Sequence, residues 1–354
     1  MARCRASSSS ISRAELVGDS ALAAGYVPFQ KHSTILITGA AGFLVTQLVT
    51  ALLSTERTAN SRLILVDLVQ PSIPQTIPDH FGSVKHAQTS NTALALQADL
   101  CDASQVDDFV RTQFGVPDTI YCLHGIMSIG CEDDFDLAMK VNIDSVRLLL
   151  DATRKFAATG NTPPKFISTS SLAVYGGPLP DVIMPSTLAA PQGTYGVTKL
   201  MCELLINEYT RRGFLDGRIV RLPTIVIRPG APSAASSSFI SGIIREPLRG
   251  VPSVCPIEDS LASTALDSLR IWVASTKTTI QKLITAAQIP ASSLLPHTRV
   301  VCLPGFTTSI REELDALQES GGENALQLVK LGLLVDEGGI VRRFKEDIDA
   351  SSDQ

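Results

Sequence analysis

The sequence lacks the features of several protein classes. No two of its seven cysteines form a C-x-x-C pair, which argues against a zinc site and for a reducing compartment. Aromatic residues make up 5% of the chain, with one tryptophan, so base-stacking platforms are not expected. The net charge is −5 and no basic run is present, which argues against a nucleic-acid surface. No apolar run is long enough to cross a membrane, so a soluble, cytoplasmic protein is expected.

The first 32 residues differ in composition from the rest of the chain. They are rich in Arg and Ser, and the first acidic residue is Glu15. Such an opening is typical of organellar transit peptides, but no convincing amphipathic helix follows. We therefore predict a flexible N-terminal extension over residues 1–32, with organellar targeting as the alternative.

Residues 33–53 read as a buried strand, a glycine turn and a helix. The run Ile35–Ile37 is apolar and β-branched, as expected of a parallel strand covered on both faces. Gly39 permits a tight turn, and Gly42 lets the backbone approach a pyrophosphate at the helix N-terminus. A second apolar strand ends at Asp67, 25 residues after Gly42, where a carboxylate binds the adenosine ribose. An acid there repels a 2′-phosphate, so the predicted cofactor is NAD rather than NADP.

One position departs from the dinucleotide-binding pattern. Val45 stands where a third glycine normally allows the helix to pack closely on the strand. A valine is expected to displace the helix slightly or to require a smaller neighbour. Taken alone, Gly39 and Gly42 also fit an ordinary strand-to-helix turn, and Asp67 is what favours the cofactor site.

A second motif lies in the middle of the chain. Tyr195 and Lys199 are four positions apart, so on a helix they project from one face. A phenol has a reference pKa of about 10, and an adjacent ammonium favours the phenolate needed for proton transfer. Ser171 ends a predicted strand and can hold a substrate oxygen, with Ser170 as the nearest competing hydroxyl. Y-x-x-x-K alone is a weak pattern, and its weight comes from the cofactor motif before it.

Together these motifs resemble the extended short-chain dehydrogenase/reductase family, also described as NAD-dependent epimerases/dehydratases. The resemblance covers about residues 33–310 and implies an α/β fold, a Rossmann-like doubly wound parallel sheet with a smaller C-terminal substrate-binding lobe. We expect an NAD-binding Rossmann domain at 33–229. Residues 230–354 are expected to form the lobe, interleaved with the first domain and shortened at its C-terminus.

The resemblance also implies the site residues. The catalytic set is Tyr195, Lys199, Ser171 and Asn142, where Asn142 supports the lysine through a bound water. An asparagine within a helix can equally bridge backbone groups without catalytic consequence. The remaining positions bind ligands. The cofactor residues are Gly39, Gly42, Phe43, Asp67, Asp99, Leu100, Tyr195, Lys199 and Leu222; the substrate residues are Ser128, Ser171, Tyr195 and Arg245; no metal site is expected.

Several stretches, including Arg221–Gly230 and Ser238–Leu248, are similar to the D-erythronate dehydrogenase group of this family. The resemblance implies NAD-dependent oxidation of a secondary hydroxyl of a small sugar acid. Arg245 could bind the substrate carboxylate, or it could form a surface ion pair with Glu246 or another acid. Residues 260–268 look like an inserted loop relative to that group.

Alternatives remain open at this stage. His124 follows a predicted strand at the ligand-binding edge and is expected to be a loop residue rather than a catalyst. The enzyme could be a reductase or epimerase acting on another polyol or specialised metabolite, or the chain could be a non-catalytic NAD sensor. The predicted partners are a hydroxy acid or polyol and, by resemblance, a second subunit packed on the helix that carries Leu200, Leu204 and Leu205.

Overall fold

The computed structural model describes most of the chain between residues 33 and 332. The described ranges are 3–4, 33–54, 61–74, 92–112, 115–157, 162–228, 237–257 and 260–332. The predicted N-terminal extension lies outside them except for the short strand β1 (Arg3–Cys4), which pairs in parallel with β7 (Val182–Ile183). The boundary predicted between residues 229 and 230 also lies outside the described residues, as does the chain after residue 332.

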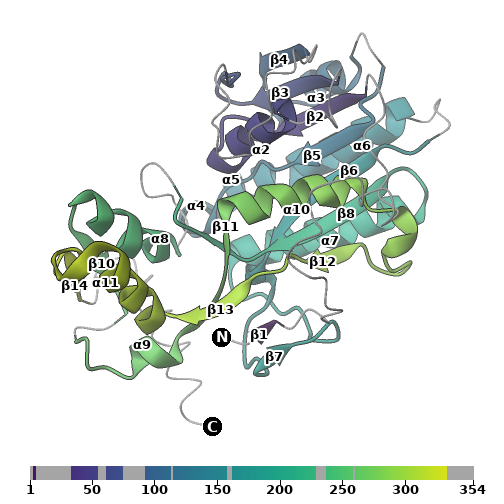
Figure 1. Ribbon diagram of the computed structural model, residues 1–354. Coiled ribbons are helices and arrows are strands. Elements are labelled where there is room, and N and C mark those ends of the chain that lie inside the picture. The colour runs from purple at the N-terminus through teal and green to yellow at the C-terminus, as the bar shows by residue number, and fades with distance from the viewer. Residues whose placement is uncertain are drawn as a thin grey trace.

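A seven-stranded sheet forms the centre of the molecule (Figure 1). Its strand order is β12-β8-β6-β5-β2-β3-β4, and every neighbouring pair is parallel. The predicted Rossmann-like parallel sheet is thereby confirmed. The strands are β2 (Thr34–Thr38), β3 (Arg62–Asp67), β4 (Thr92–Gln97), β5 (Thr119–Cys122), β6 (Lys165–Ser171), β8 (Asp216–Leu222) and β12 (Val300–Cys302).

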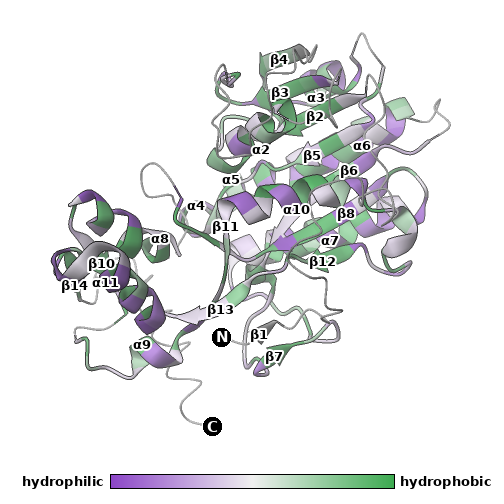
Figure 2. Cartoon of the chain, in the orientation of Figure 1, coloured by the Kyte–Doolittle hydropathy of each residue, from purple (hydrophilic) through white to green (hydrophobic). Residues whose placement is uncertain are grey.

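Helices cover both faces of this sheet because its central strands are apolar on both sides. Along β2, Ile35 and Ile37 belong to one apolar cluster and Leu36 to another, as the alternation of side chains across a strand requires. Figure 2 shows the resulting hydrophobic colour along β2, β3 and β5. The first cluster includes residues of α2 (Phe43–Leu53) and α10 (Thr276–Gln288); the second includes residues of α3 (Ala103–Val110), α6 (Ser145–Ala157) and α7 (Thr194–Arg211).

The strand order reverses direction between β2 and β5. From β2 the chain proceeds outward to β3 and β4, and then returns to β5 on the other side and continues to β6 and β8. Open parallel sheets bind ligands beyond the carboxyl ends of their strands at such a switch point. The carboxyl ends of β2 and β5 therefore mark where a cofactor is expected.

A smaller lobe lies beside the sheet and has its own apolar cluster (Figure 1). A three-stranded sheet, β13-β11-β9, connects it to the main body, with β9 and β11 parallel and β13 antiparallel to β11. The chain returns to the large sheet through α10 and β12. The elements of the lobe and its connection are β9 (Thr224–Val226), α8 (Ser238–Arg245), β10 (Ser253–Cys255), α9 (Ala265–Ser268), β11 (Arg270–Ser275), β13 (Phe306–Ser309), α11 (Ile310–Leu326, with a kink at Gly322) and β14 (Val329–Leu331).

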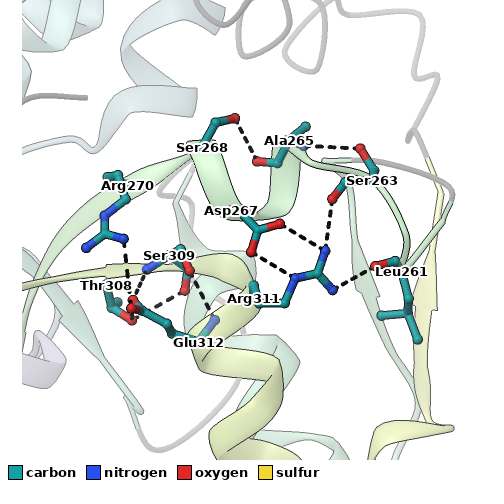
Figure 3. A network of polar contacts seen from close by, with 10 residues as sticks. All are labelled: Leu261, Ser263, Ala265, Asp267, Ser268, Arg270, Thr308, Ser309, Arg311 and Glu312. Atoms are coloured by element: carbon teal, nitrogen blue, oxygen red, sulfur yellow. Dashed lines mark hydrogen bonds and ion pairs between the residues drawn. The ribbon is translucent and has the colours of Figure 1, made fainter.

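Arg311 binds the segment 260–268, which was predicted to be an inserted loop. Figure 3 shows the Arg311 guanidinium reaching from α11 to the carboxylate of Asp267 and to the carbonyls of Leu261 and Ser263. The helix that carries Arg311 begins with a capping box between Ser309 and Glu312. Residues 260–268 are thus held against α11, and part of them forms α9. None of the helices that the structure describes is long and apolar enough to pass through a bilayer.

Candidate active site

The glycine turn after β2 is built for close backbone contacts. Gly39 has a φ of 74°, and a Cβ atom there would lie 2.9 Å from both N and Cα of His124. Gly39 is therefore required by backbone conformation and by the neighbouring strand exit. Gly42 is the N-cap residue of α2, and no side chain caps this helix. Its first-turn N–H groups therefore suit a pyrophosphate.

Acidic residues lie where the ends of β3 and β4 meet this turn. The Asp67 carboxylate accepts hydrogen bonds from Ala41 N at 3.0 Å and Val69 N at 3.2 Å. Asp99, just after β4, accepts one from Cys101 N at 2.8 Å, and the neighbouring Leu100 is buried. The residues predicted to contact the adenosine half of NAD therefore line adjacent strand ends. A carboxylate can accept several hydrogen bonds, so Asp67 and Asp99 can also accept bonds from the hydroxyls of the cofactor.

Val45 is accommodated inside the core. Its side chain is only 2% exposed and belongs to the apolar cluster that also contains Ala40, Ala274 and Ala287. The same cluster also contains large residues such as Leu48 and Leu52, so the expectation of a smaller neighbour beside Val45 stays a prediction. The substitution thus fills space without exposing apolar surface.

Tyr195 and Lys199 lie in the first turns of α7, on one face of the helix. The Lys199 Nζ atom is 5.7 Å from the centroid of the Tyr195 ring. The same Nζ atom donates a hydrogen bond to the carbonyl of Thr169 in β6 at 3.1 Å. The ammonium therefore lies between the sheet and the phenol ring, and its catalytic function stays a prediction.

Ser171 is the last residue of β6 and lies at the carboxyl edge of the sheet. Its Oγ accepts a hydrogen bond from Ala173 N at 3.1 Å, which caps the short 3-10 helix η4 (Leu172–Val174). Leu222, predicted to contact the nicotinamide, is its register partner at the end of β8. Both residues therefore reach the edge where Lys199 is anchored.

Gly196 lets the catalytic helix approach this strand end. A Cβ atom at Gly196 would lie 2.0 Å from the carbonyl oxygen of Ala173. Any residue with a Cβ atom at position 196 would prevent α7 from packing directly on the turn that follows Ser171. We did not identify Gly196 from the sequence; a glycine in the first turn of a helix, directly after the tyrosine, was the available signal.

A buried polar network lies beneath the catalytic edge. Ser170 Oγ donates to Glu203 of α7 at 2.5 Å, so the hydroxyl that competed with Ser171 in the sequence is engaged elsewhere. Arg221 of β8 binds Glu203 through Nε at 2.8 Å and Nη2 at 2.6 Å, and its Nη1 donates to the Tyr175 hydroxyl. Burial raises the pKa of Tyr175 to about 12, so this phenol stays neutral. The network connects α7 to β6 and β8.

Asn142 occupies a π-helical segment, η3 (Lys140–Asp144), between α5 (Phe135–Met139) and α6. Its amide Oδ1 accepts from Ile126 N at 2.7 Å, and its Nδ2 donates to Ile126 O at 3.1 Å and to Thr198 Oγ1 at 3.2 Å. Asn142 therefore joins the loop after β5 to the helix of Tyr195 and Lys199. Asn142 thus bridges backbone groups, which is the second of the two arrangements considered from the sequence, and it also binds a side chain of α7. The water-mediated support of Lys199 stays a prediction.

His124 is a structural link across the switch point. Its Nδ1 lies 2.7 Å from Thr38 Oγ1 and its Nε2 lies 2.7 Å from Ser145 Oγ. Burial, with a smaller contribution from the charge of Lys199, lowers its pKa to about 3, so the imidazole is neutral at physiological pH. Both ring nitrogens are committed to hydrogen bonds that connect β2, the β5 exit and α6.

The predicted substrate residues come from two elements. Ser128 is half-buried at the start of α4 (Ser128–Asp133), next to the loop that Asn142 holds. Arg245, at the end of α8, forms an ion pair with Glu246, but it is only 5% exposed, so the expectation of a surface pair is wrong. Its Nη1 also donates to the carbonyl of Arg228 at 2.6 Å.

Comparisons with known proteins identify the family to which the chain belongs. The model of the NAD dependent epimerase/dehydratase family matches residues 35–273. D-erythronate dehydrogenase of Haemophilus influenzae is 37% identical over 316 residues, which cover 89% of this chain and 91% of that protein. D-erythronate dehydrogenase of Cupriavidus necator is 38% identical over 81% of this chain and 82% of its own length.

A solved structure has a similar fold. The nucleoside-diphosphate-sugar epimerase from Agrobacterium tumefaciens superposes with a TM-score of 0.76 at 34% identity, over 90% of this chain and 86% of that chain. The predicted fold class, the NAD cofactor and the assignment as an NAD-dependent oxidoreductase are confirmed. The chain belongs to the NAD dependent epimerase/dehydratase family.

Proposed function

We propose that the protein oxidises a secondary hydroxyl of a small sugar acid, similar to D-erythronate, with NAD as the oxidant. The observation that carries the proposal is the gathering of Tyr195, Lys199 and Ser171 at the sheet edge, beside a glycine turn suited to NAD. The relatives named D-erythronate dehydrogenase support the substrate class. A hydroxyl next to the carboxylate, at C2, is the expected site of oxidation.

Tyr195 is the proposed proton acceptor. As a phenolate it takes the proton of the substrate hydroxyl, while Ser171 Oγ donates a hydrogen bond to the same oxygen and fixes its position. Lys199 stabilises the phenolate from one side and is kept in place by the Thr169 carbonyl. NAD, when bound, accepts the hydride from the substrate carbon.

Asn142 and Ser128 are proposed to support the site from the loop after β5. Asn142 accepts a hydrogen bond from Ile126 N and donates one to the hydroxyl of Thr198, so its side chain connects the β5 exit to α7. Ser128 begins α4 beside that loop, and we propose that it contacts a substrate hydroxyl. These functions follow from position, and we propose them as support for the Tyr195 reaction.

The test is a screen of four- and five-carbon sugar acids with NAD, following the absorbance of the reduced cofactor. Tyr195→Phe should lower kcat at least about 100-fold and leave NAD binding largely intact, because general acid–base catalysis contributes that much or more. Tyr209→Phe removes another phenol of α7, one bonded to Asp151, and serves as the matched control. Retained turnover in Tyr195→Phe would rule out the proposed mechanism.

The solved epimerase at 34% identity favours a second candidate, epimerisation of a nucleotide sugar. The screen therefore includes a nucleotide sugar, and isomerisation without net reduction of NAD would identify this activity. A non-catalytic sensor is the least supported alternative, because the chain keeps both Tyr195 and Lys199 in contact range. Binding of NAD with no turnover on any substrate would favour it.

We also expect a second subunit on α7. Of the leucines named for this contact, Leu204 is 64% exposed, whereas Leu205 packs against the second apolar cluster. Val197 and Met201 are also exposed, and their spacing places them on the same face of the helix as Leu204. Analytical ultracentrifugation of the protein and of Leu204→Glu measures the association.

A further inference from the structure

The chain leaves β9 through a strained residue. Ile227 has a φ of 56°, and it is the one residue other than glycine with a positive φ in the described part of the chain. A β-branched side chain rarely adopts this conformation, and strain of this kind is typical of functional sites. The Ile227 side chain is 57% exposed, so burying it does not offset the strain. The conformation of Ile227 determines where the next residue, Arg228, lies.

Arg228 is held at both its backbone and its side chain. Its Nε donates to the carbonyl of Ile225 at 2.9 Å, and its own carbonyl accepts Nη1 of Arg245 at 2.6 Å. Arg245 is buried and its charge is balanced by the adjacent Glu246. Arg245 therefore holds the backbone of Arg228 in place through this hydrogen bond.

Arg228 also lies within electrostatic range of Tyr195. Burial lowers the pKa of Arg228, the negative charge of an ionised Tyr195 raises it, and the neighbouring Arg245 lowers it further. The charges of the two groups therefore influence each other, and Tyr195 is the phenol that is proposed to take the substrate proton. The chain reaches this place from β8, whose end is in register with Ser171.

The geometry points to Arg228 as the residue that binds the substrate carboxylate, with Arg245 as its positioning residue. In a 2-hydroxy acid the reacting hydroxyl and the carboxylate are on adjacent carbons. The cation that receives the carboxylate must therefore lie close to Tyr195, and a guanidinium presents parallel N–H donors that match a carboxylate. This inference rests on the proposed function, and it gives to Arg228 the contact that the sequence suggested for Arg245.

Charge-selective kinetics tests the assignment. Arg228→Gln should lower kcat/KM for D-erythronate at least about 30-fold, mainly through KM, because it removes one partner of a desolvated charge pair. Activity on erythritol, the uncharged polyol with the same carbon number, should change much less. Arg228→Lys should restore part of the loss, and Arg245→Gln should raise KM for D-erythronate with little change in kcat. Arg211→Gln, at the exposed end of α7, is the control.

Binding measurements separate this inference from the proposed function. Calorimetry follows D-erythronate binding to NAD-loaded Tyr195→Phe protein, with and without Arg228→Gln, after unchanged NAD affinity has shown that each variant is folded. If binding depends on Arg228 but the wild type shows no turnover, the proposed reaction is wrong and the carboxylate site stands. If the wild type turns over and Arg228→Gln affects D-erythronate and erythritol equally, or neither, the carboxylate site is wrong. If D-erythronate does not bind at all, both are wrong.

Discussion

The Arg221–Glu203 pair offers a quantitative test of how the catalytic helix is held. Arg221 and Glu203 expose only 12% and 3% of their side chains, and their contact is bidentate. Arg221→Met would leave the Glu203 carboxylate buried, with Ser170 as its remaining partner in this network. Removing one partner of a buried ion pair costs about 3–5 kcal/mol, and we expect a loss of this size in the free energy of unfolding.

The chain contains a matched control on the same helix. Arg211 also binds a glutamate, Glu208, through Nε and Nη2, but these side chains are 66% and 44% exposed. An exposed ion pair of this kind is screened by solvent and contributes little to stability, so Arg211→Met should be nearly neutral.

Equilibrium urea unfolding measures both variants. The fluorescence of Trp272, the one tryptophan, and circular dichroism must give coincident transitions before the free energies are compared. Adding Glu203→Gln to Arg221→Met removes the buried charge and should recover part of the loss. If Arg221→Met costs no more than Arg211→Met, the network does not hold the helix and the reasoning is refuted.

Further predictions concern single positions. Gly196→Ala should lower kcat/KM about 100-fold, since α7 must move away from Ala173, whereas Gly332→Ala, with open space around it, should have no effect; equal activities would contradict the contact. For His124 the pKa of about 3 in the folded state lies below the unfolded value, so the stability of the protein falls as the pH drops below 6.5. Between pH 6.5 and 5, the free energy of unfolding in urea should therefore fall by about 2 kcal/mol less in His124→Gln than in the wild type. Burial raises the pKa of Glu313 to about 8, so stability falls as the pH rises from 4.5 to 8, and thermal unfolding of Glu313→Gln at pH 6 and pH 9 should show a smaller difference than wild type.

Local patterns were enough for the parts of the structure that depend on neighbouring residues. The apolar run before Gly39 became β2, and Asp67 stands at the end of β3 as its distance from the glycines indicated. The spacing of Tyr195 and Lys199 placed both on one helix face. These features are set by strand and helix periodicity, which a single sequence displays.

Contacts between distant segments could not be predicted in the same way. The need for Gly196 comes from the carbonyl of Ala173, and the partners of Asn142 belong to the β5 exit and α7. Arg245 had two possible partners in sequence, and only packing showed that Glu246 neutralises it and that it holds Arg228. Each depends on how α7 and α8 pack on the sheet edge, which no local pattern encodes.

The π-helical segment around Asn142 has a consequence for attempts to stabilise the protein. A π segment holds one residue more than a regular helix allows, and its hydrogen bonding is poorer. Deleting one residue between 140 and 144 would give an unbroken α-helix, but it would rotate one end of the helix by about 100° relative to the other. Asn142 would then lose either Ile126 or Thr198. A library designed for a more robust enzyme should therefore leave these residues unchanged.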